Sequence, residues 1–210
     1  MNILFLHLSD VHIQNNNDIK LNRLEELVQS INIFSFSEVI LIFSGDLAST
    51  GKENEYIFVE NFLKEIEKKI CNKYDNIADF KIFITPGNHD IIQNNKNKNR
   101  TSIRNLIKNN DLEKALDDEL EKMNPFLNLA KKYGCFINNQ FIDQHTLNYN
   151  NFKININLIN TGIYSVLDDE KGIHYLPRNV INNLHRNIDA DLYINVMHHS
   201  PEWFLEGNKN

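Results

Sequence analysis

The sequence predicts an α/β fold in which two packed sheets are flanked by helices. Along the first half of the chain, short apolar runs alternate with amphipathic helical patterns, which is typical of βαβ units. In the second half the period changes, and several alternating, strand-like runs follow one another. No repeat and no proline- or glycine-rich linker divides the 210 residues, so we expect a single domain with a well-buried core.

The first half supplies three strands separated by helices. Three apolar runs have the length and composition of buried strands: residues 3–8, 39–43 and 81–85. Residues 21–34 carry apolar side chains at helical spacing, and residues 53–70 form a longer amphipathic helix. Residues 97–104 are polar and basic, and we expect a loop that leads into a helix.

The second half begins with a helix and continues with strands. Residues 111–132 place a stripe of apolar side chains on one helical face, and Pro125 is expected to break or kink that helix. Strands are predicted for four further runs: residues 136–137, 141–147, 152–159 and 192–197. Pro177 is expected to open a short helix that ends near residue 185.

Composition excludes several classes of protein. The formal net charge is −6, so the chain lacks the overall basic character of a nucleic-acid binder, although a local basic groove is compatible with it. The N-terminus has no basic region of a signal peptide, and no stretch approaches the roughly 20 apolar residues of a membrane span. Cys71 and Cys135 stand alone. They fit a reducing cytoplasm, with one disulfide left open, and we expect a cytoplasmic protein with no membrane partner.

Polar residues gather where four of the predicted strands end. They are Asp10-Val11-His12, Gly45-Asp46, Gly87-Asn88-His89-Asp90 and His198-His199. Sites in open α/β sheets form outside the carboxyl ends of strands. A carboxylate can bridge two cations, and imidazole and amide groups are ligands that suit Mn, Fe or Zn better than Ca. Two such metals can clamp a phosphate and acidify a water between them.

In this order, the four motifs resemble the calcineurin-like metallophosphoesterase superfamily, and the resemblance extends from residue 3 to residue 201. It implies a four-layer α/β/β/α sandwich of two packed mixed sheets flanked by helices. It also implies a metal-dependent phosphoesterase that hydrolyses phosphomonoesters or phosphodiesters, with a metal-bridging hydroxide as the nucleophile. The implied cofactors are two divalent transition metal ions, with Mn, Fe or Zn expected.

The resemblance implies five metal ligands, position by position: Asp10 and His12 for the first metal, Asn88 and His198 for the second, and Asp46 as the bridge between them. His199 is the alternative to His198, and the spacing to Pro201 favours His198. His145, His174 and His185 have no motif around them and are expected to be surface or structural residues.

The third motif also supplies two candidate catalytic residues. His89 would lie near the phosphate, where it would stabilise the transition state or protonate the leaving oxygen. Asp90 would orient His89.

One part of the family's pattern has no counterpart in this sequence. The family closes its site with a Gly-His-x-His motif that gives one histidine to each metal, whereas this chain contains no Gly-His pair and ends at Asn210. We expect residues 1–210 to be a single metallophosphoesterase domain truncated before that segment. Each metal would then lack one imidazole, and these 210 residues alone need not be active.

The substrate would be a phosphate ester, either a small molecule, a nucleotide or a nucleic acid, and further domains of the same longer protein are expected candidate partners. One alternative is a regulatory or sensing module that keeps the fold without turnover, and the intact motif residues argue against it. The other is a nuclease effector domain of a larger multidomain protein, and the acidic net charge is mildly against it.

Overall fold

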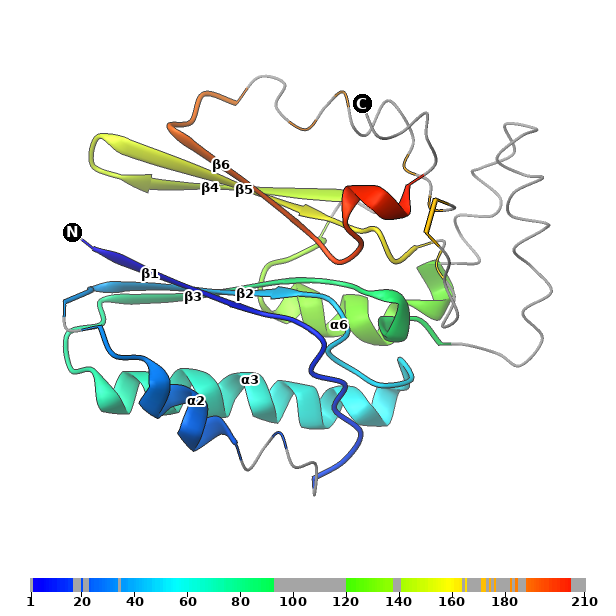
Figure 1. Cartoon of the computed structure of the whole chain (residues 1–210), viewed down its shortest axis with the longest axis horizontal. Coiled ribbons are helices and arrows are strands. Elements are labelled where there is room, and N and C mark those ends of the chain that lie inside the picture. The colour runs from blue at the N-terminus through cyan, green and yellow to red at the C-terminus, as the bar shows by residue number, and fades with distance from the viewer. Residues whose placement is uncertain are drawn as a thin grey trace.

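Two three-stranded sheets lie face to face in the computed structural model (Figure 1). It describes residues 2–16, 20, 23–33, 35–92, 120–137, 141–163, 165, 171–172, 174, 176, 182, 184 and 188–204. Helices α2 (Leu24–Ser30) and α3 (Glu53–Lys73) lie on the outer face of the first sheet. The predicted α/β fold with two packed sheets and flanking helices is therefore confirmed.

The first sheet is parallel, with the order β1-β2-β3. Its strands are β1 (Ile3–Leu8), β2 (Glu38–Ser44) and β3 (Asp79–Thr85). The central strand β2 is buried along nearly its whole length, because both of its faces are covered, and this explains its unbroken apolar run. Leu8 pairs with Phe43, and Phe43 pairs with Ile84, so the three strands end in line. A mixed sheet was expected, but the three strands described here all run in the same direction.

The second sheet is mixed, as expected. Strands β4 (Ile142–Tyr149) and β5 (Phe152–Ile159) form an antiparallel hairpin, and β6 (Leu192–Met197) runs parallel to β5. A hydrogen bond joins the two sheets where β3 and β5 end. The Thr85 hydroxyl at the end of β3 donates a hydrogen bond of 2.9 Å to the Ile159 carbonyl at the end of β5. The carboxyl ends of strands from both sheets therefore meet on one side of the sandwich.

One apolar core connects the two sheets with α3 and with α6 (Asn124–Lys132). Ile40 and Leu41 from β2 and Ile156 and Leu158 from β5 are completely buried. Full burial of such a side chain stabilises the fold by about 1.5–3 kcal/mol. The sheets are consequently fixed relative to each other, which fixes the residues that follow their strands.

The second half of the chain differs from the prediction at two places. Pro125 lies in the first turn of α6, which begins after a turn at Met123, so the predicted break is confirmed. The strand predicted for residues 136–137 is wrong, because Phe136 adopts a left-handed φ of 53°. Its ring packs against Phe126 of α6 with centroids 6.1 Å apart, so its apolar character reflects packing and not strand pairing.

Several other predictions concern the ends of elements or residues outside the described ranges. Helix α2 is shorter than the helix predicted for residues 21–34. Helix α3 is longer than the helix predicted for residues 53–70 and ends at Lys73. The loop at 97–104, the first part of the helix at 111–132 and most of the helix at 177–185 lie outside the described residues. Cys71 and Cys135 are both free thiols. Among the described helices, none is long and apolar enough to cross a membrane.

Candidate metal centre

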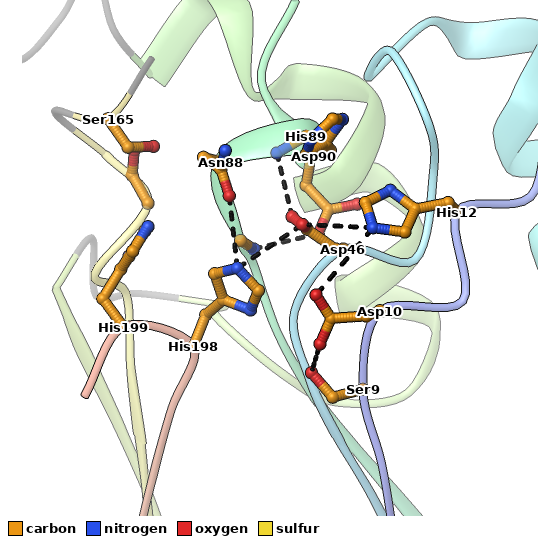
Figure 2. A network of polar contacts seen from close by, with 12 residues as sticks. Ser9, Asp10, His12, Asp46, Asn88, His89, Asp90, Ser165, His198 and His199 are labelled. Atoms are coloured by element: carbon orange, nitrogen blue, oxygen red, sulfur yellow. Dashed lines mark hydrogen bonds and ion pairs between the residues drawn. The ribbon is translucent and has the colours of Figure 1, made fainter. Parts of the chain in front are cut away.

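The four sequence motifs meet at the edge where the strands end (Figure 2). Asp10 and His12 follow β1, Asp46 follows β2, His198 follows β6, and a short 3₁₀ helix, η1 (Asn88–Asp90), follows β3. The structure thus brings together all five proposed metal ligands and both proposed catalytic residues, although they come from four strands in two sheets.

The backbone at three of the proposed ligands is held in a sparsely populated conformation. Asp10, His12 and Asp46 have left-handed φ values of 57°, 49° and 55°, a conformation that disfavours residues with a β-carbon by about 1–2 kcal/mol. Hydrogen bonds between the β1 and β2 loops hold it in place, from Asp10 N to Gly45 O at 3.2 Å and from His12 N to Asp46 O at 2.9 Å. Such local strain is characteristic of functional sites.

Two glycines allow the loops to approach each other this closely. A β-carbon at Gly45, whose φ is 98°, would lie 2.6 Å from Nδ1 of His198. A β-carbon at Gly87 would overlap Oδ1 of Asp46. Any side chain at either position would therefore displace a proposed ligand.

Asp46 is the centre of the cluster. Its side chain is only 3% exposed, and its Oδ2 lies 3.6 Å from Nε2 of His12 and 3.4 Å from Nε2 of His198. Its Oδ1 accepts a hydrogen bond of 2.9 Å from the backbone N–H of His89. Asp46 belongs to two overlapping groups of potential metal ligands, one with His12 and His89 and one with Asp10 and His198.

The orientation of His198 fits a bound cation. Nδ1 lies 2.9 Å from the carbonyl oxygen of Ser44, which can only accept, so Nδ1 carries the proton. In the neutral ring, the lone pair of Nε2 then faces Oδ1 of Asn88 at 3.2 Å and Oδ2 of Asp46 at 3.4 Å. Three acceptors converge, and a cation among them would satisfy all three. This set of nitrogen and oxygen donors suits a divalent transition metal.

The site is set up electrostatically to receive positive charge. Burial raises the pKa of Asp46 to about 6, although the nearby His198 acts in the opposite direction. Burial, and next the neighbouring His89, lower the pKa of His12. The lowered pKa favours the neutral form of His12, in which imidazole binds metals. Burial has meanwhile removed part of the hydration of the Asp46 carboxylate.

Stability without metal is expected to decrease as the pH rises from about 4 to about 6. Burial raises the pKa of Asp46 to about 6 in the folded protein, against an ordinary value of 3.8 for an aspartate. The folded state therefore binds more protons than the unfolded state in this window, and ionisation of Asp46 opposes folding. Urea unfolding midpoints in a chelator should show this decrease, and added Mn²⁺ should reverse it. The Asp46→Asn variant should lack this contribution, and an unchanged pH dependence in that variant would contradict the assignment.

The His89 ring lies beside His12. Its Nδ1 is 2.8 Å from the carbonyl oxygen of Ser49, and its ring meets the His12 ring edge-on with centroids 4.4 Å apart. Because the carbonyl can only accept, Nδ1 carries a proton and Nε2 is the nitrogen that is available for proton transfer.

Asp90 is placed differently from the expectation that it orients His89. It is fully buried, and its carboxylate accepts hydrogen bonds from the backbone N–H groups of Leu47, Ala48 and Gly87 at 3.3, 3.1 and 2.9 Å and from the Tyr56 hydroxyl at 2.9 Å. Asp90 therefore fixes the loops that carry Asp46 and Asn88, whereas the His89 ring is held by Ser49. Burial nevertheless raises the pKa of Asp90.

Replacing Tyr56 with Phe is expected to destabilise the protein by about 1–3 kcal/mol, because the buried Asp90 carboxylate loses a donor. Tyr133→Phe is a matched control. The Tyr133 hydroxyl is also buried, and within the described part of the chain it has no hydrogen-bond partner. Its removal should change the free energy of unfolding by no more than about 0.5 kcal/mol. Equal effects in urea unfolding would refute the role given to the Tyr56–Asp90 hydrogen bond.

Of the two adjacent histidines, His198 belongs to the cluster around Asp46. His199 is turned toward Ser165 and away from Asp46 (Figure 2). It is buried, its backbone N–H donates to the Thr161 hydroxyl at 3.1 Å, and its Nδ1 lies 3.0 Å from the same oxygen. The His174 ring packs against it with centroids 3.9 Å apart, so His174 is a buried structural residue.

Sequence reasoning missed several residues that support the site. The Ser9 hydroxyl donates to Oδ2 of Asp10, and the carbonyl groups of Ser44 and Ser49 set which nitrogen of His198 and His89 carries the proton. Ser9 precedes Asp10 directly, which is a usable signal. Backbone carbonyls carry no sequence signal.

Two comparisons with known proteins can be set beside this geometry. The sequence profile of the calcineurin-like phosphoesterase family matches residues 3–210. No curated protein matches the chain. The profile match covers almost all of the sequence, including every residue of the cluster around Asp46.

Proposed function

Because the chain belongs to the calcineurin-like phosphoesterase family, we propose that it is a metal-dependent hydrolase that cleaves phosphomonoesters or phosphodiesters at the cluster around Asp46. Family membership supports the hydrolase class and a phosphate-ester substrate. The proposal adds a binuclear metal centre and the roles of individual residues.

The observation that carries this proposal is the convergence of acceptor atoms on Asp46. Oδ2 of this buried carboxylate is within 3.6 Å of one histidine from the β1 loop and another from the β6 loop. A carboxylate that lies between two groups of ligands can bridge two cations. An exposed pair of opposite charges would be too weak an interaction to hold the ions in place. Asp10 and His12 would hold one ion, Asn88 and His198 the other, and Asp46 both.

The protein residues around the ions have separate tasks. When bound, two divalent ions would clamp the phosphate and provide a deprotonated water near neutral pH. Ser9 would orient the Asp10 carboxylate, and the Ser44 carbonyl would keep the Nε2 lone pair of His198 directed at the cluster. Such supporting contacts typically account for 10–100-fold in metal affinity or activity.

His89 is the proposed proton donor. The Ser49 carbonyl holds the proton on Nδ1, so a second proton on Nε2 can be given to the leaving oxygen. The backbone N–H of His89 also bonds to Asp46 at 2.9 Å. The ring is thereby tied to the carboxylate that would bridge the ions, which keeps the donor in a fixed position relative to the bound phosphate.

The test is hydrolysis of p-nitrophenyl phosphate and bis(p-nitrophenyl) phosphate by the 210-residue chain with added Mn²⁺, together with metal analysis of the same sample. The same assay is run on a longer version that contains downstream sequence, because residues 1–210 contain no Gly-His pair. We expect the longer version to hydrolyse at least one substrate, to lose this activity in a chelator, and to regain it when Mn²⁺ is restored. If the protein binds two ions per chain yet hydrolyses neither substrate nor nucleic acid, the regulatory alternative replaces the enzymatic one. The ratio of the two rates would identify the ester class.

A further inference from the structure

A second group of potential metal ligands shares no residue with the cluster around Asp46. It consists of Cys135, Asp143 and His145, whose sulfur, carboxylate oxygen and imidazole nitrogen lie within 4.8 Å of one another. None of the three residues belongs to the motifs at the strand ends. Cys135 follows α6, whereas Asp143 and His145 are both on β4, so two separate segments of the chain create the group.

The end of α6 fixes the position of Cys135. Gly134 has a left-handed φ of 75°. The N–H of Gly134 donates to the Lys131 carbonyl at 3.1 Å, and the N–H of Cys135 donates to the Ala130 carbonyl at 2.9 Å. This pair of bonds is the Schellman motif, which terminates helices. The Cys135 side chain is completely buried, with Sγ 3.9 Å from the carbonyl oxygen of Ile82 on β3.

Strand β4 presents the other two ligands on one face, because residues two apart in a strand point the same way. Nε2 of His145 lies 2.8 Å from Oδ2 of Asp143. The Asp143 carboxylate also accepts a hydrogen bond from the backbone N–H of Phe136, the residue with the left-handed φ of 53°. The His145 ring packs against Phe83 of the first sheet, with centroids 4.9 Å apart.

We propose that Cys135, Asp143 and His145 bind a single zinc ion, which links the end of α6 to the second sheet. A sulfur, a nitrogen and an oxygen ligand form a set that zinc accepts in tetrahedral geometry. The Ile82 carbonyl oxygen or a water would be the fourth ligand. Thiolate sulfur is a soft ligand that selects zinc over manganese, whereas the nitrogen and oxygen ligands around Asp46 do not. The site at Cys135 would therefore prefer zinc to manganese, whereas the cluster around Asp46 would accept either metal.

The surroundings of the three side chains support a structural ion. The Asp143 and His145 side chains are 16% and 20% exposed, which gives an ion a route to the buried sulfur. The Phe136 N–H orients the carboxylate, as supporting contacts around metal ligands commonly do. Burial raises the pKa of Cys135 to about 12, so the metal-free thiol stays protonated and is a poor nucleophile. Zinc binding would release this proton to solvent.

Cobalt absorption spectroscopy tests the proposal on the full 210-residue chain. Co²⁺ substitutes for zinc, and only a cobalt ion with a thiolate ligand gives a sulfur-to-metal charge-transfer band in the near ultraviolet. Cobalt bound at the cluster around Asp46 contributes none, because that cluster contains no sulfur. We expect a band whose intensity at saturation corresponds to one thiolate-bound cobalt per chain. It should disappear when zinc is added in excess over all of the proposed sites. The result does not depend on whether the chain hydrolyses phosphate esters.

Three variants make the test specific. Cys135→Ser should abolish the band, while Cys71→Ser, which removes the partly buried cysteine of α3, should leave it unchanged. Asp143→Asn keeps the sulfur and the shape of the site, so the band should persist but require at least about 10-fold more cobalt. No band in the unchanged protein, or a band that survives in Cys135→Ser, would overturn the proposal. Should Cys135→Ser fail to fold, unchanged cobalt affinity in Asp143→Asn would overturn it instead.

Discussion

Replacing Asp46 with Asn is expected to lower metal-dependent hydrolysis by about 10³-fold, because bound ions supply several kcal/mol of transition-state stabilisation. Asparagine keeps the shape of the side chain but removes the charge that lies 3.6 Å from His12 and 3.4 Å from His198. Its amide N–H₂ or its neutral oxygen would then replace the anionic ligand between the two groups of ligands. Metal analysis by mass spectrometry should show fewer than the two manganese ions per chain expected for the unchanged protein, and kcat/KM should fall with the manganese content.

The control is Asp189→Asn, which neutralises a fully exposed carboxylate 3.9 Å from Lys153. It makes the same change in net charge far from any proposed ligand, so its metal content and rate should equal those of the unchanged protein. Equal metal content and equal rates in the Asp46 and Asp189 variants would remove Asp46 from the centre.

His89→Ala is expected to lower kcat by about 10²–10⁴-fold while the metal is retained, as is typical when a general acid is lost. The loss should depend on the substrate. A p-nitrophenolate leaving group needs little protonation, so the variant should lose less activity on p-nitrophenyl phosphate than on phenyl phosphate. Rates on both substrates, measured with metal content on the same sample, separate proton donation from metal binding.

Two outcomes would change the role of His89. It lies in one group of potential ligands with His12 and Asp46, so loss of an ion in His89→Ala would make it a metal ligand. Equal losses on the two substrates with the metal retained would instead indicate that His89 stabilises the phosphate and does not protonate the leaving oxygen.

The sequence predicts the parts of this fold that depend on local patterns. The apolar runs of β1, β2, β3 and β6 identify strands because burial on a sheet imposes that pattern. The polar residues directly after them could be assigned to one edge, because the ends of parallel strands meet there. That reasoning places the four motifs at one edge, whereas the choice of the five proposed ligands and of His89 within them rests on the resemblance to the calcineurin-like phosphoesterase family.

Contacts between distant residues could not be predicted. The Asp90 carboxylate bonds to the backbone of Leu47 and Ala48, which are more than 40 residues away in sequence, and no side-chain pattern records that contact. For the same reason Cys135 and His145 were not recognised as neighbours: the spacing of 135, 143 and 145 matches no metal-binding motif. The apolar run at residues 136–137 alone predicts a strand, because the left-handed φ of Phe136 depends on its hydrogen bond to Asp143 and on packing.

Anomalous diffraction from crystals of the chain grown with Mn²⁺ would show whether Asp46 lies between bound metal ions. We expect manganese peaks on both sides of the Asp46 carboxylate, one in contact with His12 and the other with His198 and Asn88. Absence of manganese at Asp46 in crystals saturated with Mn²⁺, or a Lys or Arg side chain in that place, would contradict it.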